Sequence, residues 1–160
     1  MLIQRVITAI VALAAIALAL MFLPQWGITV LVGVLFVLGG REWGRLVVGG
    51  GRSMRYLYSA AIGSGCALLW WLAQRNPALA DVVYTAALVG WAVAFWLVLR
   101  YPVNLTRGVT VVAGLFVLLP AFLALALLFN GTDGIRRLLF MLVIVWCADA
   151  GAYFAGKLLG

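Results

Sequence analysis

The chain has 160 residues, of which 68% are apolar and 9% are charged. In a soluble domain roughly half of the residues are usually apolar and about a quarter are charged. This composition excludes an ordinary soluble domain, and the lack of any histidine excludes Ser-His-Asp and Cys-His catalysis and zinc ligation by histidine. The net charge of +7 would suggest nucleic acid for a soluble protein, but here the basic residues flank apolar runs. We therefore expect membrane lipids, and no nucleic acid, as partners.

The first uncharged run covers residues 6–40, and as one helix it would be about 52 Å long against a hydrocarbon core of about 30 Å. It must therefore fold back, and Pro24, Gln25 and Gly27 supply the break. The predicted spans are residues 6–23, 26–40, 56–72, 82–99, 109–129 with a kink at Pro120, and 138–156. We expect an all-α, polytopic membrane protein in which residues 1–160 form a single transmembrane domain.

The basic residues indicate how these six spans are oriented. Alternating spans place the N-terminus, the loops at 41–55 and 100–107 and the C-terminus on one side, which holds eight basic residues against three on the other. The positive-inside rule therefore predicts that both termini are cytoplasmic. A re-entrant first hairpin would reverse this bias. A cleaved signal peptide is the other alternative, but the apolar run continues to residue 40 without a polar start.

Asp149 lies near the middle of the last predicted span, where an ionised aspartate costs about 2.5 to 3.5 kcal/mol to insert. Tyr153 and Lys157 follow at i+4 and i+8, so a carboxylate, a phenol and an ammonium share one stripe of the helix. Gly151 and Gly156 beside the stripe permit close helix packing or leave room for a ligand. We favour a functional role for Asp149, and a structural hydrogen bond across the bundle is the alternative.

A second polar cluster lies at the end of the second predicted span. Arg41 and Arg45 share a helix face at i, i+4, and Glu42 can pair with Arg45 at i, i+3. Two guanidinium groups there can bind a lipid phosphate. The alternative is an interfacial anchor in which the arginines extend to the headgroups and Trp43 belongs to the aromatic belt.

Three blocks of the sequence carry a resemblance to a known family. They are Met-Leu-Ile-Gln-Arg-Val-Ile-Thr-Ala at 1–9, Glu-Trp-Gly-Arg-Leu at 42–46 and Val-Trp-Cys-Ala-Asp-Ala-Gly-Ala-Tyr-Phe-Ala-Gly-Lys at 145–157. In order and spacing they resemble bacterial phosphatidate cytidylyltransferase, also called CDP-diacylglycerol synthase. The resemblance implies a multi-pass enzyme of the bacterial inner membrane that converts CTP and phosphatidate to CDP-diacylglycerol and diphosphate, with Mg²⁺ as cofactor, in phospholipid biosynthesis.

The resemblance, together with the spacing of the two polar clusters, suggests roles for individual residues. Asp149 and Lys157 would be catalytic, with Tyr153 beside them in substrate binding; Arg41 and Arg45 are candidates for the lipid phosphate, while Glu42, Trp43, Gly151 and Gly156 would be structural or lie at an interface. The metal ligands are unassigned. The other two acidic residues, Asp81 and Asp133, fall on the predicted non-cytoplasmic side. This leaves few ligands for a cytoplasmic metal site.

Family members continue beyond the Gly-Lys pair matched by 156–157 into a Ser-Pro-x-Lys-Thr loop and a C-terminal signature that holds most catalytic and metal-binding residues. The chain therefore resembles the N-terminal portion of a longer family domain, and we expect the 160 residues alone to be inactive. Two other functions stay open: a transporter or channel subunit with Asp149 as ion relay, which would show ion flux without nucleotide, and a non-catalytic membrane assembly partner. A homodimer is also open.

Overall fold

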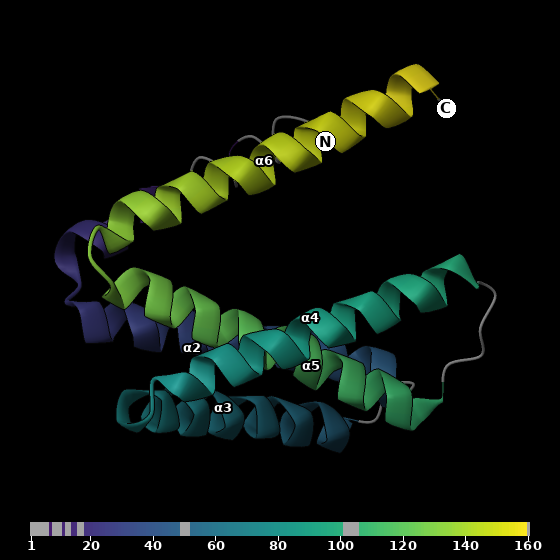
Figure 1. Ribbon diagram of the computed structural model, residues 1–160, viewed down its shortest axis with the longest axis horizontal. Coiled ribbons are helices and arrows are strands. Elements are labelled where there is room, and N and C mark those ends of the chain that lie inside the picture. The colour runs from purple at the N-terminus through teal and green to yellow at the C-terminus, as the bar shows by residue number, and fades with distance from the viewer. Residues whose placement is uncertain are drawn as a thin grey trace. The chain divides into compact units, whose positions relative to one another are not determined.

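The structure, a computed structural model, describes residues 7, 11, 14–15, 18–48, 52–100 and 106–159 (Figure 1). Its long helices are α2 (Gln25–Val48), α3 (Arg52–Arg75), α4 (Ala78–Leu99), α5 (Arg107–Asn130) and α6 (Gly134–Leu159), and residues 18–22 are helical as well. No described residue lies in a β-strand. The predicted all-α class is therefore confirmed.

The last five predicted spans each lie within one of these helices, and the helices run several residues further into the charged segments. Thus α2 continues through Arg41 and Arg45 to Val48. Within its predicted span, α5 is one helix that continues through Pro120. Charged side chains extend a helix because they reach the interface without breaking its backbone hydrogen bonds. Of the first predicted span, 6–23, the structure describes residues 7, 11, 14–15 and 18–23, and all of these except Leu23 are helical.

Four of the described helices are long and apolar enough to cross a membrane: α3, α4, α5 and residues 134–157 of α6. Each has at least 22 residues, which is about the number needed to span the hydrocarbon core. The protein is therefore a membrane protein. Two points stay predictions: α2 and residues 6–23 also cross the bilayer, and both termini are cytoplasmic.

The chain divides into two compact units by its internal contacts. One comprises Met1–Ile28 and Leu127–Gly160, and the other comprises Thr29–Ala126. The second unit, which we call the central unit, holds α3, α4 and most of α2 and α5. The first unit, which we call the terminal unit, holds α6 and the turn that precedes it.

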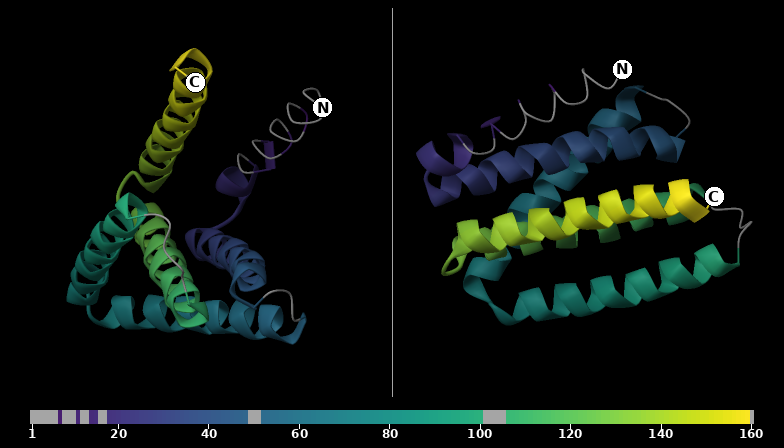
Figure 2. Two further views of the ribbon diagram at one scale, coloured as in Figure 1. Left: turned by 90° about the vertical axis from the view of Figure 1, so that its right-hand side faces the viewer. Right: turned by 90° about the horizontal axis from the view of Figure 1, so that it is seen from above.

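The core of the central unit forms where α3 packs against α2 and α5. Its buried members are Ile62 and Cys66 of α3 with Phe122 and Ala126 of α5, and the ring of Phe36 from α2 meets Phe122 edge-on at 5.9 Å between centroids. Figure 1 and the left view of Figure 2 show α3 lying across one side of these helices. Three helices therefore share one apolar core.

Glycines allow α2 and α3 to approach closely. A Cβ at Gly40 would lie 2.8 Å from Cγ1 of Ile62, and a Cβ at Gly44 would lie 3.1 Å from the Cα of Arg55. The two glycines are four residues apart, on the same face of α2. Small residues at this spacing are typical of helix pairs in membranes, where van der Waals contact, rather than the hydrophobic effect, drives association.

Candidate functional site

The predicted polar stripe of α6 is present in the terminal unit. Because α6 is a continuous helix from Gly134 to Leu159, Asp149, Tyr153 and Lys157 lie on successive turns of one face. All three are exposed, and Tyr153 has 66% of its surface accessible. Within its own unit, and over the described residues, Asp149 forms neither an ion pair nor a side-chain hydrogen bond.

The small residues beside the stripe leave this part of α6 open within its unit. A Cβ at Gly151 or at Gly156 would have no atom within 4 Å from the described part of the unit, apart from the helix's own backbone. The ring of Tyr153 meets the ring of its neighbour Phe154 edge-on, at 5.6 Å between centroids. The stripe therefore has space for a ligand or for another helix, as its sequence predicts.

The Arg41 cluster lies on the last two turns of α2, in the central unit. Nη1 of Arg45 donates a hydrogen bond to Oε2 of Glu42, and this exposed ion pair was predicted from the i, i+3 spacing. The guanidinium of Arg41 lies over the ring of Tyr56, 5.5 Å from its centroid. Nε of Arg41 is buried and has no hydrogen-bond partner among the described residues. Among the described residues Arg41 forms no ion pair, so its positive charge is not neutralised by a carboxylate of the central unit.

Trp43, between the two arginines, has a hydrogen-bond partner that the sequence alone did not indicate. Its indole Nε1 donates a hydrogen bond to the carbonyl oxygen of Thr110 on α5 at 3.0 Å, and Oη of Tyr58 on α3 donates to the next carbonyl, Val111, at 2.9 Å. A Cβ at Gly114, one turn later on α5, would overlap both donors. We call these five residues the three-helix junction. It connects α2 and α3 to α5 next to the Arg41 cluster.

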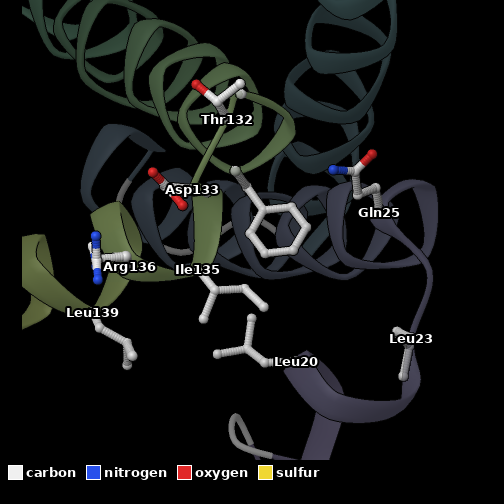
Figure 3. Close-up of a pocket in the computed structure, with 11 residues that line it drawn as sticks. Leu20, Leu23, Gln25, Thr132, Asp133, Ile135, Arg136 and Leu139 are labelled. Carbon is white, nitrogen blue, oxygen red and sulfur yellow. The ribbon is translucent and has the colours of Figure 1, made fainter.

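A pocket of about 800 Å³ with a mixed polar and apolar lining lies in the terminal unit, where α5 turns into α6. Figure 3 shows Asp133 and Arg136 on one side of it and Leu23 and Gln25 on the other. Asp133 has a positive φ of 58°, and its carbonyl accepts the first hydrogen bond of α6, from the N–H of Arg137 at 3.0 Å. The predicted orientation places this pocket on the non-cytoplasmic side, so we expect it to be separate from a cytoplasmic nucleotide site.

The acidic residues do not form a metal centre within the part of the chain that the structure describes. All four of them are described, and neither they nor the described cysteines gather into a group of three that could hold a metal ion. The side chains present therefore do not fit Mg²⁺ by themselves, since a protein magnesium site usually combines carboxylates with substrate phosphates and water.

The sequence as a whole identifies the family. Residues 3–160 match the cytidylyltransferase family. The chain belongs to this family. Among curated proteins it is similar to the phosphatidate cytidylyltransferase of Pseudomonas aeruginosa, with 38% identity over 100% of this chain and 59% of the relative. It is also similar to the phosphatidate cytidylyltransferase of Haemophilus influenzae, with 28% identity over 100% of this chain and 62% of the relative.

Family membership confirms the resemblance seen in the three sequence blocks. The chain spans about three-fifths of the length of the two relatives it matches. Neither the family nor these relatives bear the name of a transporter or channel, so the ion-relay alternative gains no support from them. No solved structure matches the chain significantly. The roles of Asp149, Lys157 and the arginines are not tested by these comparisons and stay predictions.

Proposed function

We propose that the protein acts as a phosphatidate cytidylyltransferase. The observation that carries this proposal is the family match over residues 3–160, together with two relatives of that name. In the proposed reaction a phosphate oxygen of phosphatidate attacks the α-phosphorus of CTP. The bond from the α-phosphorus to the bridging oxygen breaks, and diphosphate leaves with the electron pair. The products are CDP-diacylglycerol and diphosphate.

Negative charge grows on the diphosphate as it leaves, so the enzyme must place cations and hydrogen-bond donors beside it. We assign Lys157 to this task because it is exposed at the predicted cytoplasmic end of the α6 stripe. Tyr153, one turn before it, can donate a hydrogen bond to a phosphate oxygen. Asp149 is assigned a catalytic role because an exposed carboxylate in an apolar helix is costly and is usually kept for function.

The lipid phosphate is assigned to Arg41 and Arg45. Guanidinium groups bind phosphate with two parallel hydrogen bonds, and Arg41 forms no ion pair with a carboxylate among the described residues. Arg45 is held by Glu42 at the exposed end of α2, where a phosphate can compete with the carboxylate. The hydrogen bond from Trp43 to α5 anchors the end of α2, so the backbone positions of the two arginines are fixed before lipid binds.

Magnesium is the expected cofactor of this reaction, where it neutralises phosphate charge. The described side chains do not assemble a site for it, so no step proposed for this chain passes through the metal. We further propose that the protein is a multi-pass protein of the bacterial inner membrane and that CTP binds on its cytoplasmic side, which is the side predicted to hold Lys157, Arg41 and Arg45.

The test is a chimeric protein in which residues 1–160 replace the matching segment of the Pseudomonas aeruginosa relative. Membranes containing it are given phosphatidate, Mg²⁺ and labelled CTP, and the lipid fraction is examined for label. We expect labelled lipid that depends on added phosphatidate, and none from the 160-residue chain alone. A chimeric protein that inserts at normal abundance but makes no labelled lipid, beside an active relative, would contradict the proposal.

A further inference from the structure

An apolar groove runs along the central unit between α4 and α5. Its volume is about 690 Å³, and no charged side chain lines it. The lining residues are Ala86, Val89, Gly90, Val93, Ala94 and Leu97 of α4 and Gly108, Val109, Val112, Ala113 and Phe116 of α5. Five of these are glycine or alanine, so the groove exists because small side chains leave the space between two apolar helices unfilled.

The two helices are closest part-way along the groove and further apart at its open end. They approach each other at Gly90, where a Cβ would lie 3.1 Å from the ring of Phe116. At the open end, which is lined by Leu97 and Gly108, the two helices diverge, as Figure 1 shows. A Cβ at Gly108 would have no described neighbour within 4 Å. The groove is therefore a wedge that opens toward the end of α4 and the start of α5.

Basic residues flank the open end. Arg100 follows α4 three residues after Leu97, and Arg107 is the first residue of α5, next to Gly108. The guanidinium of Arg100 lies over the ring of Trp96, 4.4 Å from its centroid. Stacking on an aromatic face leaves the edge N–H groups of a guanidinium available to an anion. Both arginines are exposed.

The length of the groove matches one leaflet of a bilayer. From Ala86 to Leu97 the helix rises about 16 Å, which is about half of a 30 Å hydrocarbon core. An acyl chain that starts at a headgroup beside the arginines would therefore end near Ala86. A helix of a second copy suits this wedge less well, because every copy carries a net charge of +7 and brings the same basic residues to the same membrane interface.

We infer that this groove binds an acyl chain of an anionic phospholipid of the surrounding bilayer, with its phosphate at Arg100 and Arg107. The chain fills the apolar wedge between α4 and α5, and the basic open end selects lipids with net negative charge. This site uses none of the residues assigned to nucleotide transfer, so the inference can be tested independently of the proposed enzymatic activity.

The experiment uses the purified protein in phosphatidylcholine vesicles with trace spin-labelled phosphatidylglycerol or spin-labelled phosphatidylcholine. Electron paramagnetic resonance measures the motionally restricted fraction of each lipid. We expect the wild type to prefer phosphatidylglycerol severalfold, and the R100Q/R107Q variant to lose most of this preference. The matched control is R75Q, because Arg75 also stacks on a tryptophan, Trp71 at 3.8 Å, but lies at the end of α3.

Filling the groove tests the acyl chain separately. Ala94→Phe places a ring in the groove and is expected to reduce the restricted lipid per protein, whereas Ala92→Phe, on an exposed face of α4 outside the groove, should not. Ala86→Leu serves the same purpose with a smaller side chain if Ala94→Phe fails to fold. The inference would be overturned if the filled variants restricted as much lipid as the wild type. It would also be overturned if filling the groove converted a dimeric protein to a monomer, because a second copy would then occupy the groove.

Discussion

The indole of Trp43 on α2 donates a hydrogen bond to the carbonyl oxygen of Thr110 on α5, 67 positions later in the chain, at 3.0 Å. Beside it Tyr58 binds the carbonyl of Val111 in the same way. Gly114 makes both bonds geometrically accessible, because it has no side chain to cover the carbonyls of the preceding turn. The end of α2 that carries Arg41 and Arg45 is thereby joined to a second helix.

Replacing Trp43 with phenylalanine should weaken the three-helix junction. Phenylalanine keeps an aromatic ring but has no N–H, and a hydrogen bond between membrane helices contributes about 0.6 to 1.7 kcal/mol. We expect the purified variant to have a lower Tm in detergent, when its thermal unfolding is measured by circular dichroism. Trp26→Phe is the control, because Trp26 is 71% exposed. Equal Tm values for the two variants would show that the bond adds nothing to stability.

Gly114→Ala should destabilise the protein more than Trp43→Phe does. The added Cβ would overlap Oη of Tyr58 and Nε1 of Trp43, so both hydrogen bonds must lengthen or break. Gly108→Ala, earlier on the same helix, is the control because its Cβ would have no described neighbour within 4 Å. In a Tyr58→Phe background the cost of Gly114→Ala should fall, and simple additivity of the two changes in unfolding free energy would argue against direct overlap.

Asp149→Asn tests the carboxylate of the α6 stripe, in the chimeric protein described above. Asparagine keeps the shape and removes the charge, so membrane insertion should persist. Lipid product should fall at least about tenfold, which equals about 1.4 kcal/mol of transition-state stabilisation. Lys157→Ala should also slow turnover. Asp133→Asn is the matched control, because Asp133 lies on the predicted non-cytoplasmic side. Normal product formation by Asp149→Asn would make its carboxylate merely structural.

The predicted orientation is tested by reporter fusions. Fusions placed after Gly51 and after Gly160 should both report a cytoplasmic location, because the side that holds them carries eight of the eleven basic residues. A fusion within residues 130–133 should report the opposite side. A cytoplasmic signal from that turn would show that the six-span topology is wrong.

The sequence by itself determined the class of the protein, most helix positions and the family. Long uncharged runs separated by short charged segments can satisfy their backbone groups in lipid only as helices, so α3 to α6 follow directly from hydropathy. Asp149, Tyr153 and Lys157 share a stripe for an equally local reason, the fixed turn of a continuous helix. The Arg45–Glu42 pair is local too.

Only the tertiary structure decided which helix faces meet. Helices such as α4 and α5 are apolar on all sides, so no amphipathic pattern marks the packed face, and lipid competes equally well for any of them. The partner of Trp43 is a backbone carbonyl, which every residue has, and the feature that exposes it is the missing side chain of Gly114. Contacts of this kind depend on how two distant helices cross, and that crossing is a property of the packed helices together.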